Sequence, residues 1–183
     1  VDGHDYVNNA IEAGAKVVIN YFDNEQDAID TQAIIAQMGG ESIIVQGDMT
    51  KAADVKRIVE EAVKAFGNEI HVLVNVVGGI VGRKKITEQD EDWYNFLMDV
   101  NMKSCWLCTR EVVPFMPKGA SIINFSSLAA RDGGGPGASM YATAKGAVAV
   151  FTRSMAKELG PDGIRVNAVA PGTIATSFHD RFN

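Results

Sequence analysis

Short apolar runs rich in β-branched residues alternate with longer amphipathic stretches along most of the chain. The runs predict strands over residues 16–21, 42–46, 71–76, 120–125 and 164–168. The stretches between them predict helices over residues 23–38, 51–66, 88–115 and 139–159. Strands that alternate with helices indicate βαβ units, so the pattern predicts an α/β fold with a doubly wound parallel sheet and helices on both faces.

Length and composition fit a single globular domain over residues 1–183. The chain is 46% hydrophobic and 22% charged, and its net charge of −6 argues against general binding to nucleic acid. No apolar run approaches the roughly eighteen residues of a membrane span, and no signal peptide precedes the first predicted strand. We therefore expect a cytoplasmic protein that does not bind membranes.

Tyr141 and Lys145 lie four residues apart in the last predicted helix. At that spacing both side chains leave the same face of the helix. A lysine near a tyrosine favours the phenolate and lowers the pKa of the phenol, so that it can transfer a proton near neutral pH. By itself the pair is also compatible with an ordinary solvated helix face, but as chemistry it suits the interconversion of a carbonyl and an alcohol.

Other signals accompany this pair in a fixed order. Asn75-Val-Val-Gly78 follows one predicted strand, Asn101 lies in the next helix, and Ser126-Ser127 follow the strand over residues 120–125. A further strand ends in Ala170-Pro-Gly172. From about Gly14 to Thr176 this series resembles the short-chain dehydrogenase/reductase family, which implies a Rossmann-like fold and an oxidoreductase that uses NAD or NADP.

The resemblance implies catalytic roles for Asn101, Ser127, Tyr141 and Lys145. Tyr141 would donate a proton to the carbonyl oxygen, and Ser127 would hydrogen-bond the same oxygen. Lys145 would assist the tyrosine and hold the ribose, while Asn101 would hold a water that links Lys145 to solvent. The spacing from Ser127 to Tyr141 is one residue longer than the common family pattern, and Ser126 is expected to be structural.

The resemblance also assigns cofactor contacts along the chain, and Val76-Val77 depart from the family's Asn-Asn-Ala-Gly motif. The end of the strand at Tyr21 offers neither a well-placed carboxylate nor an arginine, so the sequence leans slightly to NADP, with NAD possible. The cofactor-binding candidates, which include the catalytic Tyr141 and Lys145, are Gly3, Tyr21, Asp48, Met49, Asn75, Gly78, Tyr141, Lys145, Pro171, Gly172, Ile174 and Thr176.

Both ends of the chain depart from the family pattern. Gly3 falls on the last glycine of the family's Gly-rich motif, before a polar helical segment that reaches Ala13. The first strand, the earlier glycines and the C-terminal substrate-covering segment are therefore expected to be missing, from a protein of about 250 residues in all.

The sequence leaves several substrate classes open. General resemblance points to 3-oxoacyl-[acyl-carrier-protein] reductase-like members. Arg83, Lys85 and Arg131 could instead bind the carboxylate of a keto-acid or a uronate-derived sugar, or be solvated loop charges. A Rossmann protein that binds nucleotide without catalysis is the alternative from another class, supported by the incomplete front end and the two valines.

Cys105 and Cys108 form a CxxC pair, but they lie in an apolar helical segment without a second cysteine pair, so we expect structural residues. His4, His71 and His179 show no ligand-like spacing, and no metal is expected. The resemblance implies a homotetramer or homodimer that packs through the helices over residues 88–115 and 139–159.

Overall fold

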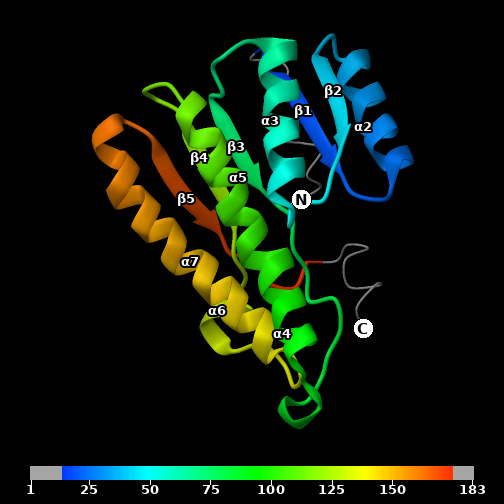
Figure 1. The fold of residues 1–183 in the computed structure, drawn as a ribbon, viewed down its shortest axis with the longest axis vertical. Coiled ribbons are helices and arrows are strands. Elements are labelled where there is room, and N and C mark those ends of the chain that lie inside the picture. The colour runs from blue at the N-terminus through cyan, green and yellow to red at the C-terminus, as the bar shows by residue number, and fades with distance from the viewer. Residues whose placement is uncertain (1–13, 175–183) are drawn as a thin grey trace. The chain divides into compact units, whose positions relative to one another are not determined.

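The computed structural model describes residues 14–174 (Figure 1). By their internal contacts the residues form two compact units, which meet after Glu69 in the sequence. Each unit is described by itself, and a single domain over residues 1–183 stays a prediction. Within the described range all strand pairs are parallel. Among these residues no helix is long and apolar enough to cross a membrane.

The first unit is a βαβ motif followed by a second helix. Its elements are β1 (Lys16–Tyr21), α2 (Glu25–Gln37), β2 (Glu41–Gln46) and α3 (Ala52–Phe66). The two strands pair in register from Lys16 opposite Glu41 to Tyr21 opposite Gln46. The predicted bounds of these four elements differ from the observed ones by two residues at most.

Local chemistry fixes the ends of the helices in this unit. The side chain of Asn24 accepts a hydrogen bond from the backbone of Asp27 and caps α2, and Gly39 ends it in a left-handed conformation, with φ of +79°. On α3, Val55, Ile58 and Val59 share one buried face. The amphipathic pattern in the sequence therefore gives the observed packing.

The second unit is a three-stranded sheet in the order β3-β4-β5, formed by Val72–Asn75, Ser121–Phe125 and Arg165–Val169. Helices connect the strands, as parallel pairing requires. The helices are α4 (Glu91–Met98), α5 (Ser104–Val112), α6 (Ala129–Asp132) and α7 (Ser139–Leu159), with short 3₁₀ turns at Ile86–Glu88, Val113–Phe115 and Gly160–Asp162. The helix predicted over residues 139–159 is confirmed.

The single helix predicted over residues 88–115 is wrong in detail, because local hydrogen bonds divide it. The Asp90 carboxylate accepts a hydrogen bond from the backbone of Trp93 at 2.7 Å and starts α4 there. A π-helical turn at Asp99–Lys103 then separates α4 from α5. Such turns often occur at functional sites, and this one contains Asn101.

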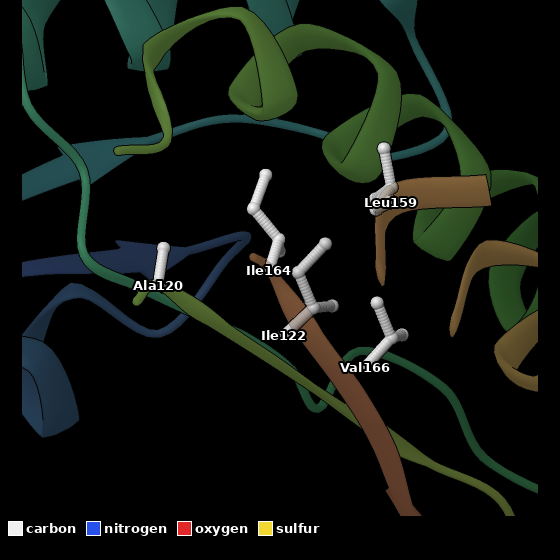
Figure 2. Close-up of a cluster of buried hydrophobic side chains, with 5 residues drawn as sticks. All are labelled: Ala120, Ile122, Leu159, Ile164 and Val166. Carbon is white, nitrogen blue, oxygen red and sulfur yellow. The ribbon is translucent and has the colours of Figure 1, made fainter. Parts of the chain in front are cut away.

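The hydrophobic core of the second unit lies beside β4 and β5. Ile122 is fully buried, with Val166 on the neighbouring strand and Leu159 at the end of α7 beside it (Figure 2). Ala120 and Ile164, which precede the two strands, complete this cluster. It fixes α7 against the sheet, and α7 carries Tyr141 and Lys145.

Candidate active site

A cavity of about 610 Å³ lies in the second unit, within the size range of small-molecule sites. Its lining includes residues that follow the carboxyl ends of β3, β4 and β5, the edge where ligands bind in α/β sheets of this kind. Seven predicted site residues line it together: Gly78, Ser127, Tyr141, Lys145, Pro171, Gly172 and Ile174.

Lys145 lies one helical turn after Tyr141 and is only 4% exposed. Its Nζ donates a hydrogen bond to the Phe125 carbonyl at 2.8 Å and lies 6.0 Å from the centre of the Tyr141 ring. Burial lowers the pKa of Lys145 to about 8, and the nearby Cys105 opposes that shift. Among the described residues the Tyr141 hydroxyl has no hydrogen-bond partner, so it is free to contact a ligand.

The two adjacent serines after β4 have different surroundings. Ser126 is 5% exposed, and its hydroxyl donates to the Lys145 carbonyl at 2.8 Å. Ser127 lines the cavity, and its hydroxyl oxygen accepts from the backbone of Ala129 at 3.2 Å. The Ser127 proton therefore stays available for a ligand, as the sequence interpretation requires.

Asn101 holds the chain that follows β3. Its side chain accepts from the Gly79 N–H at 2.9 Å and donates to the Gly79 and Leu97 carbonyls, each at 3.0 Å. These bonds use the amide oxygen and both amide protons, so the Asn101 side chain is held within the protein. The water relay from Lys145 through Asn101 to solvent stays a prediction.

Gly78 brings bare backbone against the lysine. A Cβ at this position would lie 2.8 Å from Lys145 Nζ and 2.6 Å from Asn101 Oδ1, and the φ of +145° already favours glycine. The missing side chain thus lets Lys145 Nζ and the Asn101 amide approach the backbone closely, at the edge of the cavity.

The structure places Asn75 differently from the other candidates. Its side-chain amide is buried and donates to Asn124 Oδ1 at 2.9 Å and to Thr109 Oγ1 at 3.3 Å. It does not belong to the cavity lining, so its predicted cofactor contact gains no support from its surroundings. Strand periodicity predicts the face of the sheet on which a side chain lies. It does not predict whether that side chain lies in the interior or at the edge of the cavity.

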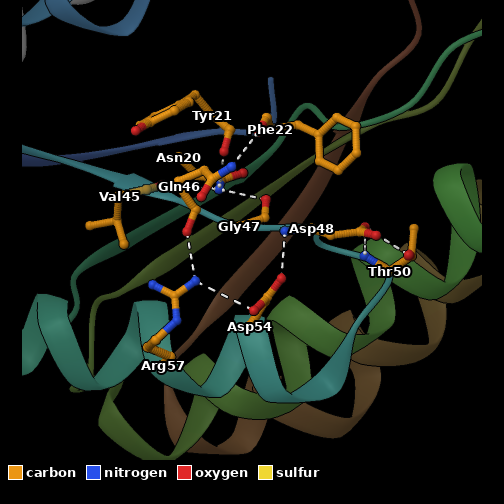
Figure 3. A network of polar contacts seen from close by, with 10 residues as sticks. All are labelled: Asn20, Tyr21, Phe22, Val45, Gln46, Gly47, Asp48, Thr50, Asp54 and Arg57. Carbon is orange, nitrogen blue, oxygen red and sulfur yellow. Dashed lines mark hydrogen bonds and ion pairs between the residues drawn. The ribbon is translucent and has the colours of Figure 1, made fainter. Parts of the chain in front are cut away.

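Three candidates, Tyr21, Asp48 and Met49, belong to the first unit and are described within it. Figure 3 shows how the ends of β1 and β2 are joined: Asn20 Nδ2 donates to the Val45 and Gly47 carbonyls at 3.2 and 3.1 Å. Asp48 Oδ1 accepts from the backbone and the hydroxyl of Thr50, at 2.8 and 2.7 Å.

The backbone of Asp48 in turn donates to the Asp54 carboxylate, a bond that contributes most to lowering the pKa of Asp54. Met49 is 6% exposed, and the Tyr21 hydroxyl donates to Glu25 at 3.0 Å. The contacts of Asp48 order the turn after β2, and that of Tyr21 joins the end of β1 to the start of α2. The other candidates, Gly3 and Thr176, lie outside the described residues.

Several cavity residues were not assigned to the site from the sequence. Ile80, Leu128, Asp132, Gly134, Gly135 and Thr173 all contribute to the lining. Apolar residues in loops carry no periodic signal, and neither does the glycine-rich loop over residues 133–137. Of the candidate substrate cations, Arg83 lines the cavity, whereas Lys85 and Arg131 are not among its lining residues.

The CxxC pair has inert surroundings. Burial raises the pKa of Cys105 to about 11 and that of Cys108 to about 12. Both thiols are therefore protonated at neutral pH, and reactive cysteines need the thiolate. Among residues 14–174 no cluster of three or more metal-ligating side chains is found.

Comparison with known proteins finds several reductases that are similar to this chain. A family model described as enoyl-(acyl carrier protein) reductase matches residues 3–183. The short-chain reductase protein NovJ of Streptomyces niveus is 42% identical over 173 residues, which are 93% of this chain and 64% of NovJ. A 3-oxoacyl-[acyl-carrier-protein] reductase of Synechocystis sp. is 38% identical over 93% of this chain and 68% of that protein.

Among solved structures, the NADH-dependent reductase A1-R' in complex with NAD has a TM-score of 0.85 and 34% identity. The match covers 93% of this chain and 74% of that structure. A1-R' is a reductase responsible for alginate metabolism, and a second structure of it is also similar to this chain.

Fold and site together define a Rossmann-like α/β protein with a tyrosine and a lysine in one cavity. The chain belongs to the short-chain dehydrogenase/reductase family. It spans about 64% of the length of NovJ.

Proposed function

We propose that the protein is an oxidoreductase that reduces a carbonyl to an alcohol, or catalyses the reverse, with a nicotinamide dinucleotide. The observation that carries this proposal is the shared cavity of Ser127, Tyr141 and Lys145. A buried lysine costs free energy, because desolvation disfavours its charge. A merely structural role for Lys145 would not require that cost.

In the proposed reaction Tyr141 donates its hydroxyl proton to the substrate's carbonyl oxygen. Ser127 donates a hydrogen bond to the same oxygen and stabilises the charge that develops there. The positive charge of Lys145 offsets the negative charge left on Tyr141. When bound, the cofactor supplies the hydride to the carbonyl carbon.

Gly78 and Lys145 are the residues proposed to hold the cofactor near the reacting atoms, with Pro171, Gly172 and Ile174 of the segment after β5. Tyr21, Asp48 and Met49 of the first unit are proposed for the adenosine end. Thr176 and Gly3 are carried over from the family pattern alone.

The choice between NADP and NAD has support on both sides. No carboxylate follows β1 directly, since Phe22 comes next and is 62% exposed, which favours NADP. The similar A1-R' is NADH-dependent, which favours NAD. We propose NADP as the preferred cofactor, to be decided by the ratio of kcat/KM for NADPH and NADH.

As substrate we propose a 3-oxoacyl thioester, on the strength of the Synechocystis relative. The second candidate is a keto-acid or a uronate-derived sugar, which Arg83 in the cavity lining favours. A homotetramer or homodimer and a cytoplasmic location stay predictions.

The direct test follows NADPH and NADH absorbance in the full-length protein with 3-oxoacyl thioesters, keto-acids and uronate-derived ketones. We expect turnover with at least one class of substrate. Tyr141→Phe is the matched control and is expected to be inactive. Nucleotide binding without turnover of any carbonyl would contradict the proposal and favour a non-catalytic nucleotide-binding protein.

A further inference from the structure

Arg83 lies where two loops of the second unit meet. Its guanidinium Nη1 donates to the Pro136 carbonyl at 3.2 Å, and the next residue, Lys84, donates its N–H to the Gly137 carbonyl at 3.2 Å. Gln89 extends the junction, because its amide donates to Ser139 Oγ at 3.0 Å. The loop after β3 is thus joined to the glycine-rich loop before α7.

Glycines leave the room that the arginine occupies. A Cβ at Gly135 would lie 3.1 Å from Arg83 Nη1, and one at Gly137 would lie 3.0 Å from Arg83 Cβ. Gly137 also has a φ of +77°, so a side chain there would be strained as well. The composition of the glycine-rich loop therefore permits this position of Arg83 beside the cavity.

The backbone before Arg83 is held in an unfavourable conformation. Val81 has a φ of +57°, which is rare for a β-branched residue, and Gly82 donates to the Ile80 carbonyl at 2.6 Å across it. Ile80 is 8% exposed and lines the cavity. Strain of this kind persists where the surroundings fix it, often near functional groups.

The charge of Arg83 is not neutralised by the described residues. No carboxylate in residues 14–174 forms an ion pair with it, and one of its five N–H groups is used by Pro136. The neighbouring Lys84 differs, since its Nζ lies 3.8 Å from Asp90 and 4.7 Å from the Trp93 ring centre. Arg83 is thus the cation of this loop that lines the cavity and keeps donors for a ligand.

One carboxylate shares the cavity with Arg83. Asp132 lines it and accepts a hydrogen bond from the Gly134 N–H at 2.8 Å, which holds the carboxylate in the turn after α6. Neither group neutralises the other through an ion pair. A ligand with its own anionic oxygens would contact a guanidinium that still has four free donors.

We propose that Arg83 binds an anionic oxygen group of the substrate, inside the cavity that holds Ser127 and Tyr141. A guanidinium matches the geometry of a carboxylate or a phosphate, so the anion is the carboxylate of a keto-acid or the phosphate of a pantetheine thioester. This assignment rests on the proposed function, because it takes Tyr141 as the group that meets the carbonyl.

The test compares charged and neutral forms of one substrate in Arg83→Met. Acetoacetate and levulinate are each assayed beside their methyl esters, and acetoacetyl-coenzyme A beside acetoacetyl-N-acetylcysteamine. Lys85→Met is the matched control. It removes an equal charge two residues after Arg83, and the Lys85 side chain is not part of the cavity lining. Arg83→Lys keeps the charge without the forked geometry.

We expect Arg83→Met to lower kcat/KM for the charged member of one pair roughly ten- to hundredfold, and to leave its neutral partner within about threefold. A selective loss in an acid and ester pair identifies a carboxylate, and one in the thioester pair identifies a phosphate. Lys85→Met should change neither, and Arg83→Lys should fall between the wild type and Arg83→Met.

An equal loss for charged and neutral members would overturn the proposal, since it would mean that Arg83 only joins the two loops. No loss at all would overturn it as well. If the wild type turns over neither member of any pair, these keto-acids and acetoacetyl thioesters are not its substrates, and the proposed function then depends on the remaining carbonyls of the test above. The binding of levulinate and coenzyme A, followed by ligand-observed NMR in wild type and Arg83→Met, then decides the question for Arg83 by itself.

Discussion

Two groups of polar residues in the second unit, one within the strands and one beside their carboxyl ends, have opposite surroundings. In the interior, Asn75 of β3 and Asn124 of β4 are opposite each other in register, and Asn124 is fully buried. Asn124 also donates to Thr152 Oγ1 at 2.9 Å, and the Cys105 thiol lies 3.4 Å from its Oδ1. Both amide protons of Asn75 and one amide proton of Asn124 therefore have acceptors within the protein.

At the carboxyl ends of the same strands the polar groups are left open. Ser127 and Tyr141 keep hydroxyl protons that no described residue accepts, and Lys145 is charged at a cost in stability. A closed network stabilises a fold, whereas open donors around a cavity are arranged for a ligand. The comparison therefore separates residues that hold the sheet from residues that carry out chemistry.

The largest effect on stability is expected at the closed network. Asn124→Leu leaves the buried Asn75 amide without its shorter acceptor contact and should lower the free energy of unfolding by about 3 kcal/mol. Urea denaturation measures this change. Asn167→Leu, at an exposed asparagine of β5, is the matched control and should stay within about 0.5 kcal/mol of wild type.

The double variant Asn75→Leu/Asn124→Leu sharpens this prediction. It removes donor and acceptor together, so it should recover part of the stability lost in the single variant. If Asn124→Leu were as stable as wild type, the network would not hold the sheet.

The next largest expected effect is on catalytic activity, and it distinguishes Ser127 from the neighbouring Ser126. Ser127→Ala should lower kcat/KM about a hundredfold, because it removes a hydrogen bond to the developing charge. Ser126→Ala, the matched control, should keep kcat/KM within about threefold. Each variant loses one hydrogen bond, so each should lose about 1 kcal/mol of stability. Equal losses of activity in the two would argue against the distinction.

The smallest expected effect is on the free energy of unfolding, which depends on pH because Lys145 is buried. The pKa of Lys145 is about 8 in the folded protein, against an ordinary value of 10.5. Between these values the unfolded chain binds the proton more readily, so stability rises with pH in that window. This contribution is complete above the unfolded pKa and is lost as the pH falls through about 8.

Lys145→Met removes that dependence on pH. Near pH 7 the variant should gain stability relative to wild type, and the gain should shrink by about 2 kcal/mol on going to pH 10. Denaturation of both proteins at the two pH values measures the difference. A gain that does not change with pH would show that Lys145 is not desolvated in the folded protein.

The sequence predicted those features that depend on local geometry. Tyr141 and Lys145 share a helix face because four residues make about one turn, and the strands follow from runs of β-branched residues. The interior position of Asn75 depends on partners 34 and 49 residues away in the chain, Thr109 and Asn124. Such contacts leave no periodic signal.

The same limit applies to the cavity wall. Arg83 was one of several candidate cations, and what distinguishes it is a contact with Pro136, 53 residues further along the chain. The break in the helix predicted over residues 88–115 depends on the Asp90 cap and on one π-helical turn. An apolar periodic pattern continues across both, so periodicity alone predicts one helix.

The most direct test of the account is Tyr141→Phe in the full-length protein, with kcat/KM, cofactor binding and the free energy of unfolding measured together. We expect a fall in kcat/KM of about a thousandfold, with cofactor affinity within about threefold and stability within about 0.5 kcal/mol of wild type. Activity within tenfold of wild type would contradict it, because the open hydroxyl of Tyr141 would then not be the proton donor.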